Sequence, residues 1–489
     1  MRSRSETPSF VNRHYPALAA AALVLAAFNL TFRLGSEIVT EWDESLYAIT
    51  AAEIVACGHW IGTTFMGALD YYNTKPPLNV WLIALSFKAF GSNLVSLRLP
   101  SIVAAWLTVA ILQIWARRTL GSLVALLSSL VLSTTFGFIY DHAGRSANTD
   151  ALFTLLVLLA VVTCWAARER PWRLAWLGPL TAAVFLLRGM AVLLPISIVA
   201  AVELRHHARS QRERWLPLAA ALALFLLPVT AWIVARWRLD QWQFIERLFV
   251  YDFLARSLTV IEDHPCSPLY YLNILQRNQF DWMAAAVTAA MIYAIPHWNY
   301  VRSRLVFWRS RDVLTLLIGT WAALTLLIPS LMRTKLSWYL NSFYPPFAVV
   351  VACVFAAGLA GHLSAATSHR RKVMLVLLFV VTITAAESRL MWYSYHRRAL
   401  TASSQGLLLA ERRTLEKQTV FGDHWTHSEV FVLKAIVGAE HREINNLEEF
   451  LRNSRIGDYF FSPSEVTDPD MLLVRSNGRH RLYRRRGRG

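Results

Sequence analysis

Two short stretches decide the fold of this chain: E-W-D-E-S-L-Y-A at residues 41–48 and Y-Y-N-T-K-P-P-L at residues 71–78. They lie in a polar loop between two apolar runs. Asp43 and Glu44 follow directly after a predicted membrane helix. Ionised carboxylates are costly inside lipid, so we expect both acids at the water boundary or in a polar cavity. The pattern predicts a loop, residues 35–77, that is held against one face of a membrane.

The composition is typical of a polytopic membrane protein. The chain has 489 residues, of which 55% are apolar and 17% charged, and its mean hydropathy is +0.37. The charges cluster between long apolar runs, as they do when hydrophobic helices alternate with polar loops. The formal net charge of +17 falls mostly in those loops. We therefore attribute it to topology and contact with anionic lipids, and not to nucleic-acid binding.

About eleven apolar segments are long enough to cross a bilayer, or nearly so. They are 15–34, 97–116, 121–140, 150–167, 174–187, 190–203, 215–236, 281–298, 312–330, 340–361 and 372–391. The run from Pro77 to Phe87 would span only about 16 Å as a helix, so we expect it to lie at the interface. The region 174–203 crosses twice if the chain turns back at Arg188. The predicted number of crossings is about 11–13.

Basic clusters set the predicted orientation. They fall at every second loop, at Arg117-Arg118, 168–173, 205–214, 302–311 and 370–372. The positive-inside rule places all of them in the cytoplasm. The loops that then face outside are 35–96, 141–149, 237–280 and 331–339. We expect a multi-pass protein of the bacterial inner (plasma) membrane with its functional loops on the extracytoplasmic side.

After about residue 392 the composition becomes more polar. We expect a transmembrane domain at 1–391 and a small extracytoplasmic α/β domain at 392–489. Alternating apolar residues predict strands, and longer apolar periods predict helices. The predicted strands are 419–423, 458–461 and 471–483, and the predicted helices are 428–437 and 446–451. Asn477-Gly478 indicates a hairpin turn within the last strand pair.

Carboxylates, cations and aromatic side chains gather in the outer loops. They are Asp43, Glu44, Lys75, Asp141, His142, Arg145, Asp150, His264, Tyr270, Tyr271, Arg333, Lys335, Trp338 and Tyr339. A site that joins a water-borne hydroxyl to a lipid-borne phosphate needs this mixture. A carboxylate removes the proton of the acceptor, and Lys and Arg stabilise the departing phosphate.

Each of these residues also has a structural interpretation. Asp150 can cap the helix that starts at Ala151. Lys75 and Lys335 can extend their aliphatic stems along the interface. The tyrosines fit an aromatic belt equally well, and His264 lies in a Pro-flanked loop where a structural role is open.

The chain resembles the PMT-type branch of the GT-C glycosyltransferases. That branch includes protein O-mannosyltransferases and the bacterial aminoarabinose transferase that modifies lipid A. The resemblance covers roughly residues 15–360. The motifs that carry it are D-E at 43–44, K-P-P-L at 75–78, W-L-x-A-L-S-F-K-x-F-G at 81–91, R-L-P-S at 98–101, G-R-S-A-N-T-D-A-L at 144–152, L-L-R-G-M-A-V-L-L-P at 186–195, H-P-C-S-P-L-Y-Y at 264–271 and T-K-L-S-W-Y-L-N-S-F-Y-P-P at 334–346.

This resemblance implies a mostly α, GT-C type fold and an activity. A sugar would move from a polyprenyl-phosphate donor, with inversion, to a hydroxyl or phosphate of lipid A, another glycolipid or glycan, or a protein. Asp43 would be the catalytic base and Asp150 a second essential acid. Lys75 and Arg145 would contact the donor phosphate. The remaining residues implied to bind substrate are Glu44, His264, Tyr271, Lys335 and Tyr339.

The sequence also departs from that family at three points. Thr74 stands where bacterial relatives often carry Glu, Arg188 where many carry Lys, and Asn341-Ser342 where Leu-Pro is commoner. Thr74 puts a Glu/His metal site in doubt, so we assign no metal ligands and no cofactor, and the need for a divalent metal stays open. None of these departures removes an acid or a cation that the implied mechanism needs.

Two other functions remain open. A transporter or flippase of lipid-linked glycans would carry repeated halves and charged groups near the bilayer midplane. The sequence shows no repeat, and Arg188 is the nearest candidate for such a charge. An outer-face binding or assembly protein would use the C-terminal domain. Transfer of label from a polyprenyl-phosphate sugar separates the enzyme from both.

Overall fold

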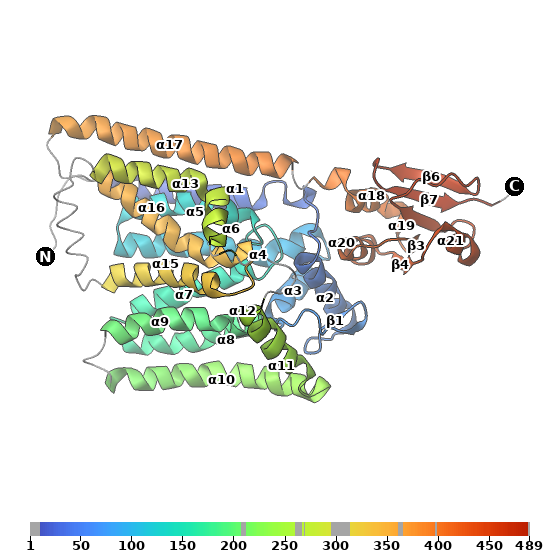
Figure 1. The fold of residues 1–489 in the computed structure, drawn as a ribbon, viewed down its shortest axis with the longest axis horizontal. Helices are drawn as coiled ribbons and strands as arrows, with labels where there is room; N and C mark the ends of the chain where they lie inside the picture. Colours follow the sequence, from blue (N-terminus) through green and yellow to red (C-terminus); the bar gives the residue numbers. More distant parts are fainter. Residues whose placement is uncertain are drawn as a thin grey trace.

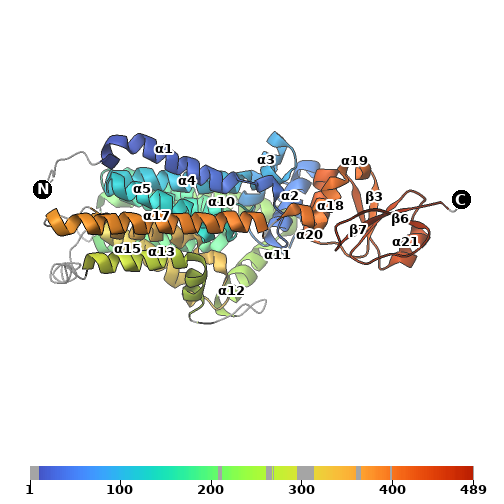
Figure 2. The same ribbon diagram turned by 90° about the horizontal axis from the view of Figure 1, so that it is seen from above.

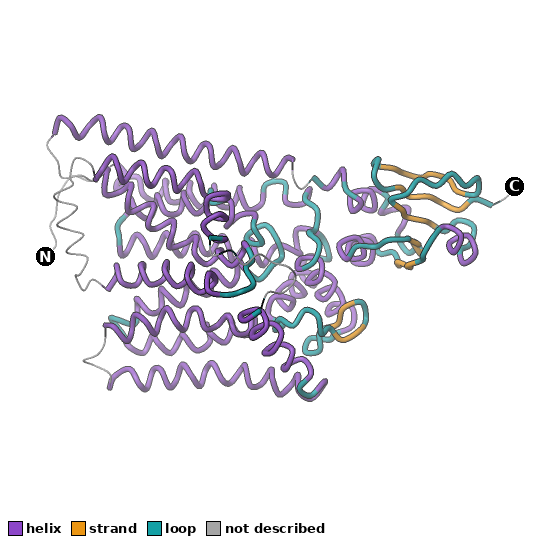
Figure 3. Tube along the Cα trace, viewed as in Figure 1, coloured by secondary structure: helices purple, strands orange, loops and turns teal. Residues whose placement is uncertain are grey.

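The chain folds into a helical bundle with a small sheet domain at one end (Figure 1). The structure is a computed structural model, and it describes residues 10–206, 212–259, 267, 269–294, 313–359, 365–396 and 399–487. Figure 3 shows that the helices fill the bundle, whereas the strands lie in the C-terminal domain and in one small hairpin. The predicted combination of a mostly α membrane protein with a C-terminal α/β domain is confirmed.

Long helices with apolar sequences make up the bundle. Within the described residues they are α1 (Phe10–Thr31), α4 (Leu94–Thr119), α5 (Ser122–Ser133), α7 (Asp150–Ala166), α8 (Leu177–Arg188), α9 (Leu193–His206), α10 (Arg212–Asp240), α13 (Tyr270–Ala294), α15 (Val313–Leu331), α16 (Tyr344–Leu359) and α17 (Ala365–His396). Seven helical segments of the described chain are long and apolar enough to cross a membrane. Three shorter apolar helices are α3 (Leu78–Phe90), α5 and α7.

Helices α8 and α9 form the expected reversal at Arg188. The side chain of Arg188 is paired with Asp150, the first residue of α7. The other ends of this pair of helices lie near the last turn of α7, because Arg173 bonds to the carbonyl oxygen of Ala166 at 3.0 Å and Cys164 contacts Glu203 at 3.7 Å. The chain therefore runs from one end of α7 to the other and back. The total number of crossings stays a prediction.

Two predicted spans differ from the helices that form. Helix α13 begins at Tyr270, eleven residues before the predicted start at 281, and has a non-helical residue at Gln279. Tyr270 and Tyr271 therefore lie in a helix and not in the outer loop. The polar residues of its first half interrupt the apolar pattern, which moved the predicted start too far along the chain. The predicted span 121–140 is divided into α5 and α6 (Phe136–Tyr140).

The outer loop 35–77 contains regular structure of its own. Helix α2 (Asp43–Cys57) is followed by a hairpin of β1 (Thr64–Phe65) and β2 (Ala68–Leu69). Helix α3 then packs against α2 and α4. The run 77–87 is thus a helix, as predicted, and its place at a membrane interface stays a prediction.

Short helices connect α10 to the next bundle helix. They are α11 (Gln243–Arg247), a π-helical segment Leu248–Ala255 and α12 (Arg256–Leu258). After α15, a 3-10 segment, Ser337–Phe343, leads directly into α16. These irregular segments meet at the same end of the bundle as α2. Irregular backbone at membrane depth is tolerated where it lines a cavity or is buried in protein.

The C-terminal domain contains a five-stranded mixed sheet of order β4-β3-β5-β7-β6. Strands β3, β4 and β5 are parallel, and β5, β7 and β6 are antiparallel. The strand bounds are β3 (Thr419–Gly422), β4 (Glu440–Glu443), β5 (Tyr459–Ser462), β6 (Met471–Ser476) and β7 (Arg481–Arg485), and the helices are α18 (Ser404–Ala410), α19 (Arg412–Leu415), α20 (His427–Phe431) and α21 (Leu447–Asn453). The predicted hairpin forms, because Asn477 N bonds to His480 O at 3.2 Å.

One hydrophobic core joins the sheet domain to the outer loop. Buried side chains of α2 and α3 belong to the same cluster as those of α18, α20 and β5. The rings of Phe87 and Phe431 stack across this boundary, with centroids 6.0 Å apart. Figure 2 shows α2, α3 and α20 side by side between the bundle and the sheet. The C-terminal domain is therefore packed on the loop that carries Asp43.

Candidate active site

A cavity of about 610 Å³ lies where the loops at the sheet end of the bundle meet. Its polar part is lined by residues of α2 and the loops before α3 and α7, together with Arg188. Its apolar part is lined by residues of α9, α15 and the segments near them, namely Leu193, Leu194, Phe253, Ile328, Pro329, Met332 and Leu336. The cavity can hold a charged group at one end and a hydrocarbon chain at the other.

Asp43 and Lys75 face each other in the polar part of the cavity. Lys75 Nζ lies 3.4 Å from Asp43 Oδ1 and donates to Tyr47 Oη at 2.8 Å. The side chains of Lys75 and Asp43 are 19% and 29% exposed, so both reach the cavity without being fully solvated. Asp43 begins α2 and Lys75 precedes α3, and the packing of α2 on α3 brings them together.

Both groups stay charged at neutral pH. Burial raises the pKa of Asp43, but the charge of Lys75, with smaller contributions from His142 and Arg188, outweighs it, so the pKa lies below its usual value of 3.8. Burial lowers the pKa of Lys75, and the charge of Asp43 outweighs that effect and raises it. An ionised carboxylate beside a cation can accept a proton from a hydroxyl bound next to it.

Arg188 supplies a second cation to the cavity. Its guanidinium is paired with Asp150 and lies over the rings of Phe153 and Tyr339, with centroids at 5.3 Å and 5.1 Å. Asp150 itself is buried and reaches the cavity only through this arginine. Gly189 follows Arg188 with φ +54°, a left-handed conformation that turns the chain sharply after α8.

His142 and Trp338 add a pair of stacked rings to the wall. Their centroids lie 3.7 Å apart, with an angle of 18° between the rings. His142 Nδ1 contacts the Asn148 side-chain nitrogen at 2.8 Å. The two segments that carry the rings are also joined by the Ser337 hydroxyl, which donates to Asp141 Oδ1 at 2.9 Å. The sequence predicted these residues to gather on one face but gave them no role.

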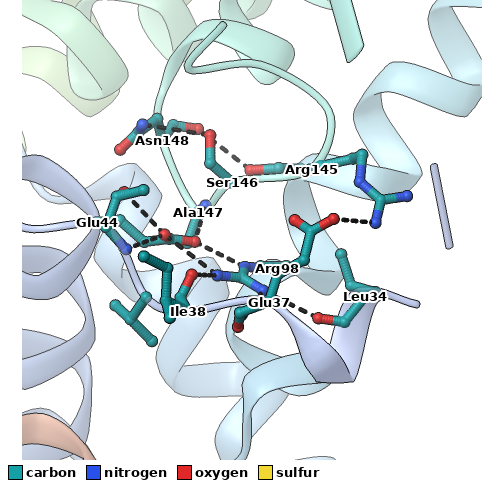
Figure 4. A network of polar contacts seen from close by, with 12 residues as sticks. Leu34, Glu37, Ile38, Glu44, Arg98, Arg145, Ser146, Ala147 and Asn148 are labelled. Atoms are coloured by element: carbon teal, nitrogen blue, oxygen red, sulfur yellow. Dashed lines mark hydrogen bonds and ion pairs between the residues drawn. The ribbon is translucent and has the colours of Figure 1, made fainter. Parts of the chain in front are cut away.

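Glu44 lies beside Asp43 but points away from the cavity. Its carboxylate accepts from Arg98 Nε at 2.8 Å and from the backbone N–H of Ala147 at 3.1 Å, and both charged side chains are fully buried (Figure 4). It also accepts from the backbone and hydroxyl of Thr40, each at 2.8 Å. The expected substrate contact of Glu44 therefore has no counterpart in this geometry. The residue joins α2, α4 and the loop before α7.

Arg145 is likewise placed away from the cavity. Its guanidinium is paired with Glu37 (Figure 4). It also donates to the carbonyl oxygens of Asn29 and Phe32, both at 2.6 Å. The side chain is 1% exposed. The expected contact of Arg145 with a donor phosphate therefore has no counterpart here, because the guanidinium is occupied on the far side of the loop. Arg188, in contrast, lines the cavity.

The remaining predicted site residues divide into three groups. Tyr339 lines the cavity, as the resemblance implied. Lys335 and Tyr271 are buried and are not part of the cavity wall, and Lys335 Nζ bonds to the carbonyl oxygen of Met332. His264 lies outside the described residues, as does Cys266. Among the residues that the structure describes, no group of three or more His, Cys, Asp or Glu is placed to hold a metal ion.

Comparisons with known proteins find one family model and several similar proteins. Residues 74–232 match the family PMT_2, described as dolichyl-phosphate-mannose-protein mannosyltransferase. An undecaprenyl phosphate-alpha-4-amino-4-deoxy-L-arabinose arabinosyl transferase of Pseudomonas savastanoi pv. phaseolicola is 31% identical over 52% of this chain and 48% of its own length. The protein of the same name in Pseudomonas aeruginosa is 28% identical over 68% of this chain and 58% of its own length. The chain thus spans about half to three-fifths of these relatives.

Solved structures share the fold. ArnT from Cupriavidus metallidurans, in a crystal structure bound to undecaprenyl phosphate, superposes with a TM-score of 0.67 at 16% identity, over 96% of this chain and 97% of that one. An oligosaccharyltransferase from Archaeoglobus fulgidus superposes with a TM-score of 0.51 at 12% identity, over 87% of this chain and 62% of that one. At these identities both similarities concern the fold alone.

Proposed function

Since this chain is a homologue of the PMT_2-family glycosyltransferases, we propose that it moves a sugar from a polyprenyl-phosphate donor to an acceptor on the extracytoplasmic face. The observation that carries the proposal is the cavity itself, whose wall contains a carboxylate, Asp43, together with two cations, Lys75 and Arg188. The apolar wall next to these charges suits a prenyl chain. A lipid phosphate that carries a sugar needs these three properties in one place.

The proposed reaction is a single displacement. Asp43 accepts the proton of an acceptor hydroxyl, and the acceptor oxygen attacks the anomeric carbon of the bound sugar. The bond between that carbon and the phosphate oxygen breaks, and polyprenyl phosphate leaves with the bonding electron pair. One displacement inverts the configuration at the anomeric carbon. The proton stays on Asp43 until water removes it.

Lys75 and Arg188 would stabilise the leaving phosphate. Charge develops on the phosphate oxygens as the bond to the sugar breaks, and fixed cations in a cavity shielded from water lower the energy of that state. Arg188 replaces Arg145 in this role. We assign to Asp150 the task of holding Arg188 in place, since its carboxylate is paired with that guanidinium. Tyr339 would lie beside the phosphate, because Arg188 is positioned over its ring.

The orientation follows from the charges at the opposite end of the bundle. The described basic clusters lie at the end of α4, after α7 and at the start of α10 and α17, all at the end away from the sheet domain (Figure 1). The positive-inside rule places that end in the cytoplasm. The cavity and the sheet domain then face the outside of a bacterial inner membrane, where lipid A or another envelope glycan is available as acceptor.

A transfer assay tests the proposal. The purified protein in nanodiscs receives radiolabelled undecaprenyl-phosphate aminoarabinose and lipid A, and the label that passes to lipid A is measured. We expect transfer by the wild type and a loss of at least 10²-fold in Asp43→Asn, the size that is typical for removing a general base. Lys75→Ala should lose comparable activity. Near wild-type turnover in both variants would contradict the assignment.

A second arm of the assay uses other substrates. If lipid A receives no label, the donor is offered with envelope glycans and membrane proteins from a strain that lacks the protein. Consumption of the donor in any arm supports a transferase. Movement of intact donor across a liposome membrane, without consumption, would instead indicate a flippase.

A further inference from the structure

The segment just before Asp43 is bound to the C-terminal domain at three alternate residues. Glu37 forms an isolated antiparallel bridge with Ala399. The Gln405 side chain accepts from Val39 N at 2.8 Å and donates to Val39 O at 2.9 Å. Glu41 accepts from the first two backbone N–H groups of α20, those of His427 and Ser428, at 2.8 Å and 3.1 Å. The segment 37–41 is thus attached to the domain by one backbone bridge and by side-chain hydrogen bonds at two further residues.

The other side of the segment is bound to the bundle. Arg98 donates to the carbonyl oxygens of Leu34, Glu37 and Ile38, at 3.0, 3.3 and 2.5 Å (Figure 4). The same guanidinium is paired with Glu44, the residue that follows Asp43. Asp43 therefore lies between a buried ion pair on one side and the C-terminal domain on the other.

The backbone at the start of α2 is held in an unfavourable conformation. Trp42 has φ 67° and ψ −118°, which a bulky residue rarely adopts. Its ring lies edge-on to His427, with centroids 6.1 Å apart. Such strain persists only when the surrounding contacts over-determine it, and it concentrates at functional sites. The carbonyl oxygen of Trp42 accepts from Ser45 Oγ and Leu46 N of α2, both at 2.9 Å. On the other side, the ring of Trp42 meets α20 and its neighbour Glu41 is bonded there.

We infer that the C-terminal domain is part of the catalytic machinery, with Gln405 and Glu41 as positioning residues that fix the carboxylate of Asp43 in the cavity. The inference rests on the proposed function, because it assigns the domain to the transfer step. Neither residue takes part in the chemistry. Gln405 lies outside the cavity wall; Glu41 does line the cavity, but both of its carboxylate oxygens accept from backbone N–H groups of α20. A displacement of about 1 Å at a reacting group can cost about 10²-fold in rate.

The variant Gln405→Met tests the inference. Methionine has nearly the same length and volume, but it leaves the buried N–H and C=O of Val39 without the two bonds from Gln405. We expect kcat for sugar transfer to fall 10- to 100-fold, with the Kd for undecaprenyl phosphate changed less than twofold, since Lys75 and Arg188 are untouched. Turnover is expressed per undecaprenyl-phosphate binding site, so that misfolded protein does not count.

The matched control lies in the same domain. Glu465 is exposed and pairs with Arg481 at 3.5 Å, away from the segment 37–41. Glu465→Gln should leave kcat and Kd unchanged. Glu41→Gln, which keeps an oxygen for the α20 N–H groups, should retain more activity than Glu41→Ala. Unchanged kcat in Gln405→Met, or equal losses in kcat and phosphate affinity, would overturn the inference.

A double-mutant cycle shows whether Gln405 acts through Asp43. The conservative variant Asp43→Glu moves the carboxylate by one methylene, and we expect it to retain measurable transfer. If the bonds from Gln405 to Val39 serve only to place Asp43, Gln405→Met should lower kcat less in the Asp43→Glu background than in the wild type. Strictly additive losses would indicate a general structural effect and overturn the assignment. Absence of transfer by the wild type itself would instead contradict the proposed function.

Discussion

Asp43 owes its charge state to neighbours that lie far from it in the sequence. Burial alone would raise its pKa, and Lys75, His142 and Arg188 together reverse the shift. A general base must be deprotonated to act, so a lowered pKa keeps it active in acid. Because activity is lost only as the pH falls through the lowered pKa, the acid limb of the proposed transfer reaction should lie below the usual carboxyl value of 3.8.

This acid limb should move when a cation is removed. We expect His142→Gln to raise the pKa of Asp43 and shift the acid limb of kcat/KM to higher pH. The measurement is the pH dependence of transfer between about pH 3 and 8, with His441→Gln in the C-terminal domain as the control. A wild-type acid limb at pH 5 or above would show that another group controls activity.

Arg98 and Glu44 form a buried ion pair beside the site. Both side chains are fully buried, and the guanidinium also serves three carbonyl oxygens. Removing one member leaves the other charge buried and unpaired, which costs about 3–5 kcal/mol. Arg98→Ala should therefore lower stability by about that amount, measured by thermal unfolding in detergent. Glu169→Ala removes an exposed pair with Arg173 and should cost about 0–1 kcal/mol. Equal effects would refute the comparison.

Among the helices, α8 and α9 matter to the cavity because the turn between them carries Arg188. It places Arg188 beside Asp150, at the opposite end of α7 from Glu203. The turn depends on Gly189, whose φ of +54° is unfavourable for other residues and whose added Cβ would lie 2.9 Å from Leu248. The turn between α8 and α9, two helices that are short for a bilayer, thus brings Arg188 to the cavity.

The variant Gly189→Ala should disturb this turn. Left-handed strain and the contact with Leu248 together cost about 1–3 kcal/mol, and the shift of Arg188 should weaken the binding of undecaprenyl phosphate roughly tenfold or more. Isothermal binding and thermal unfolding measure the two effects. Gly319→Ala is the control, because a Cβ there meets nothing within 4 Å in the middle of α15. Unchanged affinity in Gly189→Ala would argue against the phosphate role of Arg188.

Over the molecule as a whole, the sheet domain and the outer loop share one core. Phe431 of α20 is 1% exposed and stacks on Phe87 of α3. The cluster around them also contains α2 residues, including Tyr47 beside Lys75. Loosening the domain should therefore loosen the loop that carries Asp43.

Replacing the stacked ring tests this coupling. Phe431→Ala removes a buried aromatic side chain at a cost of about 3–5 kcal/mol. Amide hydrogen exchange should become faster in α2 as well as in the sheet domain. Ile456→Ala, at a side chain that is 72% exposed, should change neither. Faster exchange confined to the sheet domain would mean that the two regions open independently.

From the sequence alone we could predict most of the long helices, the reversal at Arg188, and the strands β3, β5, β6 and β7, but not α2, β4 or the start of α13. The predicted elements follow from apolar periodicity and from the cost of charge in lipid, which are properties of neighbouring residues. Only the tertiary structure decided which charges face the cavity. Arg145 is paired with Glu37, 108 residues away, and Glu44 with Arg98, so neither is available to a substrate, while Arg188 is. Partners of buried charges are set by three-dimensional packing, and no local pattern encodes that choice.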